Sequence, residues 1–173
     1  MGHGDFDMKL RRAECPAKTA EIVEKTIKAV YPHYYPPGAV QFFLELHREE
    51  RIRKAMANEE IYLALIQGEI VGTGSIREND ICRLFILPQY QARGYGSRLM
   101  DLLEERVLQK YESVHIDASF PAEGMYLKRG YKILTYEKIE TEGGDFLCYH
   151  TMEKKAVQDD NGDKRLDSGK SKV

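Results

Sequence analysis

The sequence lacks several features that would place the chain in a specialised class of protein. No apolar run approaches the length of a membrane-spanning helix, and no signal peptide opens the chain. Its three cysteines, Cys15, Cys82 and Cys148, are scattered and have neither metal-ligand nor C-x-x-C spacing. We therefore expect reduced thiols, no bound metal, no membrane partner and a cytoplasmic protein.

An excess of charge of one sign is also missing. The 173 residues include 26 Lys and Arg against 28 Asp and Glu, which gives a formal net charge of −2. Domains that coat nucleic acid are usually strongly basic, so this balance argues against a nucleic-acid partner. With 42% hydrophobic and 31% charged residues, the chain has the composition of one globular domain that buries a core without disulfide staples.

The pattern of apolar residues predicts one folded domain over residues 8–153. Residues 1–7 are expected to be a disordered leader or a cloning remnant, and 154–173 a disordered charged tail with few apolar anchors. Periodicity and turn residues predict strands at 8–13, 61–66, 70–76, 80–87, 113–118, 132–139 and 146–152. Helices are expected at 16–30, 98–108 and 121–129. A further helix should follow the aromatic and proline-rich segment 31–38, with its charged residues 48–54 forming a solvated face.

A glycine-containing turn, 91–97, connects the apolar strand 80–87 to the amphipathic helix 98–108. Gly94 and Gly96 allow positive φ and close approach of a ligand to the backbone. The first N–H groups of the following helix lack intrahelical partners and lie at the positive end of its dipole. Such a turn binds phosphate or pyrophosphate, although a glycine pair can also serve only as a tight turn.

Two common nucleotide-binding motifs do not fit this turn. A dinucleotide fingerprint requires a third glycine where Leu99 stands, and a P-loop requires a lysine where Ser97 follows Gly96 directly. The pattern that remains is Q-x-x-G-x-G after an apolar strand that ends in proline.

This pattern resembles the acetyl-CoA signature of the GNAT superfamily of N-acetyltransferases. Gln91, Gly94 and Gly96 match it, and 84–88 matches the strand before it. The segment 125–131 resembles a second family motif, with methionine in place of an aromatic residue. The resemblance implies a mixed α/β fold with a mostly antiparallel sheet flanked by helices. Its parallel strands, ending near residues 87 and 118, would splay apart and form the CoA cleft.

The resemblance also implies acetyl-CoA as cosubstrate. The pantetheine arm would pair with the strand backbone, and the pyrophosphate would bind backbone N–H groups of the turn, with arginines adding charge and Gln91 bracing the turn. The cofactor-binding residues implied in this way are Phe85, Ile86, Leu87, Gln91, Ala92, Arg93, Gly94, Tyr95, Gly96, Ser97, Arg98 and Ser119.

The implied reaction is direct attack of a primary amine on the acetyl thioester within a ternary complex. Tyr126 matches the family position that protonates the leaving thiolate, and the backbone N–H of Ile86 or Leu87 is the candidate oxyanion donor. For the general base, Asp117 and Glu78 are both candidates, and either can instead be an ordinary solvated carboxylate.

The acceptor is expected to be a small-molecule or peptide amine bound partly by the aromatic segment, where Tyr31, His33, Tyr34 and Tyr35 could receive a cation. The same residues could instead form a rigid loop that closes the core. A non-catalytic acyl-CoA sensor or regulatory module remains an alternative function, a nucleotide-binding protein is a more distant one, and a homodimer is an alternative to a monomer.

Overall fold

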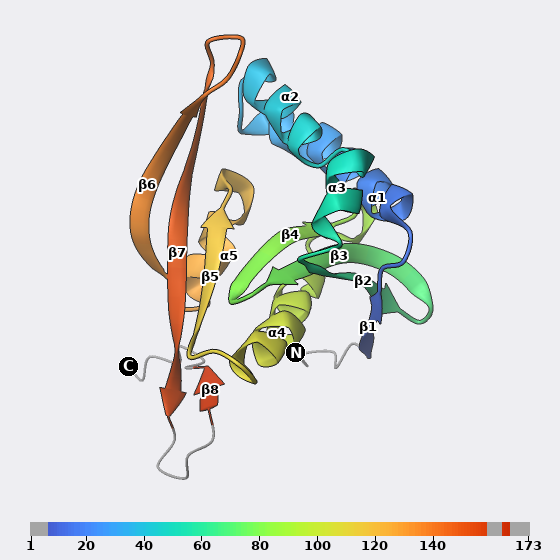
Figure 1. The fold of residues 1–173 in the computed structure, drawn as a ribbon, viewed down its shortest axis with the longest axis vertical. Helices are drawn as coiled ribbons and strands as arrows, with labels where there is room; N and C mark the ends of the chain where they lie inside the picture. The colour runs from blue at the N-terminus through green and yellow to red at the C-terminus, as the bar shows by residue number, and fades with distance from the viewer. Residues whose placement is uncertain (1–6, 159–163, 167–173) are drawn as a thin grey trace.

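The computed structural model describes residues 7–158 and 164–166, which form a mixed α/β fold (Figure 1). The N-terminal half contains β1 (Met8–Arg12), α1 (Pro16–Val30), the 3-10 helix η1 (Tyr31–His33), α2 (Pro37–Leu46), α3 (Glu49–Ala55), β2 (Glu60–Ile66), β3 (Glu69–Arg77) and β4 (Asp80–Ile86). The rest contains the 3-10 helix η2 (Pro88–Tyr90), α4 (Tyr95–Leu108), β5 (Ser113–Ala118), α5 (Phe120–Lys128), β6 (Lys132–Glu140), β7 (Phe146–Gln158) and β8 (Lys164–Leu166).

The strands lie in the order β1-β2-β3-β4-β5-β7-β6, with β8 paired to the end of β7. Every neighbouring pair is antiparallel except β4 and β5, which are parallel. Helix α4 connects these two strands, as a strand–helix–strand crossover requires. The predicted mixed, mostly antiparallel sheet is therefore confirmed.

The parallel strands diverge soon after they meet. Only Asp80 with His115 and Ile81 with Ile116 are paired. In β4 the register against β3 then shifts, because two residues separate Cys82 from Phe85 where one residue separates their partners. Arg83, inside this bulge, has a left-handed φ of 48°. A bulge bends its strand, so β4 turns away from β5, and the two strands separate as the resemblance implies (Figure 1).

Both faces of the sheet are covered by helices. In β2, Tyr62 and Ala64 belong to the cluster packed around α4, whereas Ile61 and Leu63 belong to a cluster with α1 and α3. This alternation is the period of two expected of a strand. In α4 the predicted apolar face is buried, with Leu99, Leu103 and Val107 at most 1% exposed.

The charged segment after α2 differs from its prediction. The chain breaks at His47 and Arg48 and begins a separate helix, α3, instead of continuing one helix with a solvated face. Ile52 explains the difference, because it is fully buried and fixes α3 against α1 and β2. A single apolar residue in a run of charges gave too weak a pattern to predict this contact.

The folded domain also continues beyond residue 153, where the sequence predicted a disordered tail. Strand β7 runs to Gln158, with Lys154 buried opposite Val114 and the N–H of Ala156 donating to the carbonyl of Glu112 at 2.8 Å. The tail was predicted because this segment has few apolar side chains. Hydrogen bonds between backbone groups hold it in the sheet instead. Residues 159–163, 167–173 and 1–6 lie outside the described residues.

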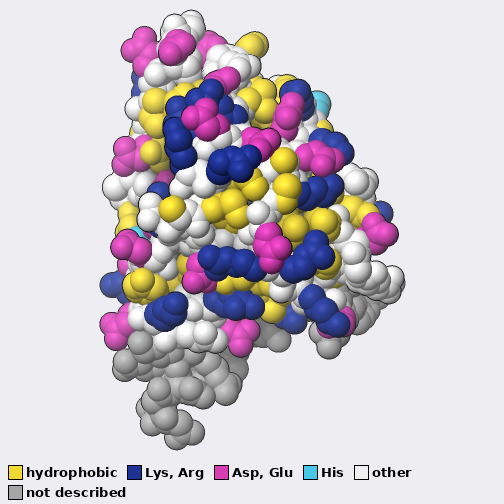
Figure 2. Space-filling view, turned by 45° about the vertical axis from the view of Figure 1, so that its right-hand side comes forward, with side chains coloured by type: hydrophobic (Ala, Val, Ile, Leu, Met, Phe, Trp, Pro, Cys, Tyr) yellow, Lys and Arg dark blue, Asp and Glu magenta, His cyan; other side chains and the backbone are white. Residues whose placement is uncertain are grey.

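Charged side chains of both signs are interspersed on the face shown in Figure 2. Cys15, Cys82 and Cys148 are free thiols. Within 7–158 and 164–166, no helix has the length and apolar character needed to cross a membrane.

Candidate active site

The glycine turn leads directly into α4. Helix α4 begins at Tyr95, three residues earlier than predicted, and Gly94 is its N-cap with φ of 81°. The second left-handed residue of the turn is Ala92, with φ of 58°, whereas positive φ was expected at Gly96. Gly96 therefore lies in the first helical turn, where its N–H is one of the groups left without an intrahelical partner.

Gln91 holds this turn against β4. Its Nε2 donates to the carbonyl of Ile86 at 2.9 Å, and the same carbonyl accepts a longer bond of 3.4 Å from Thr26 Oγ1 in α1. The end of β4, the turn and α1 are thereby tied together at one carbonyl. Gln91 thus braces the turn, as expected.

A cavity of about 390 Å³, here named the turn cavity, lies between this turn, α1, the end of β4 and the start of α5. Of the twelve residues predicted to bind the cofactor, nine line it: Phe85, Ile86, Gln91, Ala92, Gly94, Tyr95, Gly96, Ser97 and Ser119. A cavity of the size that ligands use therefore lies at the head of α4, and cofactor binding there stays a prediction.

The other three predicted residues lie outside the turn cavity. The N–H of Leu87 donates to the carbonyl of Val71 at 2.9 Å, so it is not available to a ligand. Arg93 is exposed and lies over the ring of Tyr90, with 5.8 Å from guanidinium carbon to ring centroid. The Nε of Arg98 is buried and has no hydrogen-bond partner among the described residues.

The backbone of β4 presents polar groups to the gap between the parallel strands. In an antiparallel ladder, the N–H and C=O of successive residues point alternately toward and away from the neighbouring strand. Because Leu87 bonds to β3, the N–H and C=O of Ile86 point away from β3. The C=O already accepts from Gln91 and Thr26, which leaves the N–H for a ligand. Of the two predicted oxyanion donors, only Ile86 has the required direction.

A second cavity, of about 380 Å³, follows the separation of β4 and β5 and is here named the seam cavity. Its walls come from α2, the middle of β4, the end of β5 and the β6–β7 hairpin. Five residues line both cavities: Tyr31, Leu84, Phe85, Ser119 and Ala122. The two cavities therefore meet where the parallel strands come apart.

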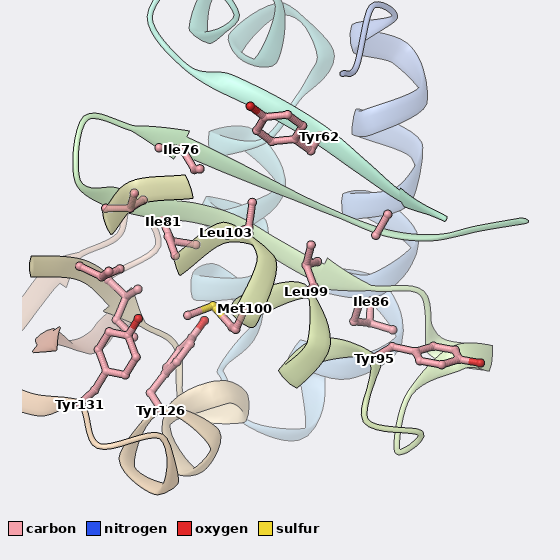
Figure 3. Close-up of a cluster of buried hydrophobic side chains, with 14 of the residues drawn as sticks. Tyr62, Ile76, Ile81, Ile86, Tyr95, Leu99, Met100, Leu103, Tyr126 and Tyr131 are labelled. Atoms are coloured by element: carbon pink, nitrogen blue, oxygen red, sulfur yellow. The ribbon is translucent and has the colours of Figure 1, made fainter. Parts of the chain in front are cut away.

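Tyr126 lines the seam cavity and is only 5% exposed. Its ring extends from α5 beside that of Tyr131, with 5.7 Å between centroids, and its hydroxyl points toward Met100 (Figure 3). Burial raises the pKa of the Tyr126 phenol well above its usual value of 10. Tyr126 consequently stays protonated at neutral pH.

A buried charge cluster fixes the end of the helix that carries Tyr126. Arg129, one residue past α5, donates through Nη2 to Glu104 Oε2 at 2.6 Å and to Asp101 at 2.7 Å. Its Nη1 donates to Ser97 Oγ at 2.9 Å, and Tyr131 donates its hydroxyl to Glu104 Oε1 at 2.8 Å. The turn cavity and the Tyr126 helix are therefore joined through one guanidinium.

The two predicted bases lie in different places. Asp117 lines the seam cavity with its side chain exposed to solvent at the mouth. Loss of some hydration to the cavity walls, followed by the neighbouring Asp80, raises the pKa of its carboxyl above the usual value. Glu78 is exposed in the β3–β4 turn, outside the lining of both cavities. The structure therefore leaves Asp117 as the candidate base.

The four predicted acceptor-binding residues separate into different roles. Tyr31 is buried, lines both cavities and donates its hydroxyl to Ser119 Oγ at 3.4 Å, whereas the exposed Tyr34 lines only the turn cavity. His33 is exposed and lines neither cavity. Tyr35 is buried and accepts the N–H of Phe120 at 2.7 Å, so it serves the core. The segment therefore closes the core through Tyr31 and Tyr35, and acceptor binding by its residues stays a prediction.

The sequence did not suggest the polar floor of the seam cavity. His47 lies edge-on to Phe85, with 5.4 Å between ring centroids, and Arg83 forms an ion pair with Glu59. These residues come from the end of α2, where His47 is the C-cap, from β4 and from the loop before β2, and no local pattern connects them. Among the described residues, no group of three or more His, Cys, Asp or Glu side chains could hold a metal ion.

A glycine turn at the head of a helix and a separated parallel pair of strands are the features by which the sequence resembled an acyltransferase, and the structure contains both. The Acetyltransferase (GNAT) domain model matches residues 30–156. The chain belongs to the GNAT family, and it is an acetyl-CoA-dependent acetyltransferase.

Individual proteins agree with this assignment. YafP, an uncharacterized N-acetyltransferase of Escherichia coli K12, is 25% identical over 129 residues, which are 75% of this chain and 83% of YafP. A GCN5-related N-acetyltransferase structure from Rhodopseudomonas palustris has a TM-score of 0.78 and 24% identity, covering 90% of this chain and 98% of the other. The PaiA N-acetyltransferase of Thermoplasma acidophilum, solved with coenzyme A, has a TM-score of 0.64 and 19% identity, covering 86% and 99%.

Proposed function

We propose that the enzyme transfers the acetyl group of acetyl-CoA to a primary amine, with the donor in the turn cavity and the amine in the seam cavity. The observation that carries this proposal is that the two cavities share five lining residues at the point where β4 and β5 separate. A thioester held there would be accessible to an amine from the other side. Direct attack in a ternary complex then needs no covalent enzyme intermediate.

The residues around the turn cavity fit the donor. The N–H groups from Ala92 to Ser97 would receive the pyrophosphate at the positive end of α4. The outward-facing N–H of Ile86 would pair with the thioester carbonyl of the pantetheine arm as in an added strand, since the Ile86 C=O already accepts from Gln91 and Thr26. Gly96 leaves room for this approach, because a Cβ built there would meet no atom nearer than 3.7 Å.

Three groups would carry the chemistry in this proposal. Asp117 accepts a proton from the ammonium form of the amine, directly or through water, so that the nitrogen lone pair can form the bond to the acetyl carbon; the nitrogen releases its second proton to water as the amide forms. The N–H of Ile86 donates to the oxyanion that develops on the acetyl oxygen. As the C–S bond breaks, Tyr126 gives its proton to the sulfur and is reprotonated from solvent.

Localisation and assembly belong to the same proposal. The three free thiols support a site of action in the cytoplasm. The homodimer remains a prediction, and the surface that supports it is the edge strand β6, where Ile133, Leu134 and Tyr136 are exposed. Edge strands present unpaired backbone groups that a second copy can use.

Thermal-shift titrations with acetyl-CoA, CoA, ATP and NAD test the donor site. A ligand at about 100 times its dissociation constant stabilises a fold by about 2.7 kcal/mol. We expect the two CoA species to raise the melting temperature and ATP and NAD to leave it unchanged. A larger shift with NAD or ATP would contradict the proposal, because the turn would then bind a different phosphate ligand.

The variant Gly96→Ala sharpens this test. The added methyl meets no close atom in the free protein, and alanine is more favourable than glycine in a helix. The free energy of unfolding should therefore stay unchanged or rise by about 0.5 kcal/mol. The methyl would extend between Ile86 and Met125, which both line the turn cavity, and should weaken CoA binding by about tenfold through overpacking. Calorimetric titration of both proteins measures the difference. Equal affinities would show that no ligand approaches Gly96.

A further inference from the structure

Charged side chains at the seam cavity are mostly neutralised by one another. Five formally charged residues line it: Glu59, Arg77, Asp80, Arg83 and Asp117. Glu59 and Arg83 form an ion pair with side chains only 7% and 10% exposed, and Ser75 Oγ donates to the same Glu59 oxygen at 3.1 Å. Arg77 and Asp80 form a second pair at 3.1 Å. Two of the three carboxylates therefore already have a cation.

Two further titratable groups of the lining contribute no charge. Burial, and then the positive charge of Arg83, lower the pKa of His47 to about 3, so its imidazole is neutral at physiological pH. Burial raises the pKa of the Cys82 thiol to about 11, which keeps it protonated. The remaining polar lining consists of hydroxyl groups.

Asp117 is therefore the one carboxylate of this lining without an ion-pair partner, although the positive charges of Arg77 and His115 act on it from a distance. No hydrogen bond or ion pair joins its side chain to another of the described residues. It stands at the end of β5, one residue before the buried Ala118 and two before Ser119, which lines both cavities. An ammonium group beside Asp117 would thus lie next to the junction of the two cavities.

The walls around this carboxylate are apolar and largely aromatic. Helix α2 contributes Phe42, Phe43 and Leu46, and the β6–β7 hairpin contributes Ile139, Leu147 and Tyr149. Aromatic faces attract one cation and also shelter an apolar body from water. They offer few hydrogen-bonding groups to a densely hydroxylated sugar, because only scattered hydroxyl groups such as that of Tyr149 stand among them.

We propose that the acceptor is an amine with a single positive charge and an apolar or aromatic body, and that polycationic and anion-bearing amines are poor acceptors. This inference rests on the proposed acetyl transfer and adds the substrate class. A second cation would lose its hydration among apolar walls and meet Arg77 or Arg83 without a free carboxylate. An added carboxylate would find both arginines already paired and would be repelled by Asp117.

Amines that share one chain length and differ only in the group opposite the reacting nitrogen isolate the effect of a second charge. Hexylamine, hexamethylenediamine and ε-aminocaproate share a six-carbon chain and end in a methyl, an ammonium and a carboxylate. We expect kcat/KM for hexylamine to exceed that for either of the others by about tenfold, the size of one uncompensated charge contact in a partly desolvated site. Phenethylamine should be at least as good as hexylamine. Thiol release in the presence of acetyl-CoA measures all four.

A gain of function in one variant provides the sharper test. Arg77→Gln removes an arginine whose side chain is 51% exposed, so the fold should tolerate it, and leaves Asp80 without its partner. The ratio of kcat/KM for hexamethylenediamine to that for hexylamine should then rise about fivefold. Arg53→Gln is the matched control, because it also removes an arginine from an exposed ion pair, with Glu49, but lies outside both cavities. Its ratio should equal that of the wild type.

The outcomes separate this inference from the proposed function. If the diamine is acetylated as well as hexylamine, or if Arg77→Gln leaves the ratio unchanged, the inference is wrong although acetyl transfer stands. If acetyl-CoA raises the melting temperature but none of the four amines is acetylated, the inference is likewise overturned. If acetyl-CoA does not bind at all, the proposed function fails together with it.

Discussion

Replacing Tyr126 with phenylalanine should lower kcat about 100-fold and leave the affinity for acetyl-CoA unchanged, because only the proton donor to the leaving sulfur is lost. The ring would still fill its place beside Tyr131, so the fold should be preserved. Steady-state kinetics and calorimetric titration of acetyl-CoA measure the two quantities. An unchanged kcat would show that Tyr126 is not the acid.

The pH dependence adds a second readout for Tyr126. Burial raises the pKa of its phenol above the usual value of 10, and the protonated form is the one that donates. Wild-type kcat should therefore show no alkaline decline up to about pH 10, where an ordinary tyrosine would be half ionised. Tyr131→Phe is the matched control, because the Tyr131 hydroxyl donates to Glu104 and not to a substrate. Its loss should reduce the free energy of unfolding by about 1 kcal/mol without the fall in kcat expected for Tyr126→Phe.

Glu104→Gln should destabilise the protein by about 3 kcal/mol, with a fall in melting temperature of about 10 °C. Glu104 is 2% exposed and its partner Arg129 is 12% exposed, so the substitution leaves a guanidinium buried without its main counter-charge. Removing one member of a buried pair is costly because water cannot replace it. Denaturant and thermal unfolding measure the loss.

Asp101→Asn is the control within the same cluster. Asp101 also bonds to Arg129, but its side chain is 51% exposed, and exposed ion pairs contribute less than about 1 kcal/mol. Equal losses from the two substitutions would contradict the view that burial decides the cost. Because Arg129 also bonds to Ser97, we expect Glu104→Gln to weaken acetyl-CoA binding as well.

The sequence predicted those parts of the molecule that depend on local pattern. The spacing of Leu99, Leu103 and Val107 identified the buried face of α4, and the strand–helix–strand order required β4 and β5 to be parallel. The glycine turn was located because its residues are contiguous. Each of these inferences uses residues close together in the chain.

Features that depend on distant contacts were not predicted. Arg83 adopts a left-handed conformation inside the β4 bulge, although arginine carries no preference for it. Its partner Glu59 lies 24 residues earlier, and the two meet only because β2, β3 and β4 are neighbours. The same holds for the order of β7 beyond residue 153, which depends on pairing with β5.

The two residue pairs between β4 and β5 have a mechanical consequence. The strands β1 to β4 and the strands β5, β7 and β6 form two parts of the sheet that are joined by only these two pairs of described residues, so we expect the free enzyme to open first along this line. A pantetheine arm lying on Ile86 would bridge β4 and β5. Hydrogen exchange of the backbone amides in these two strands should therefore slow when the donor binds. The supply of acetyl-CoA in the cell would then set the lifetime of the enzyme as well as its rate.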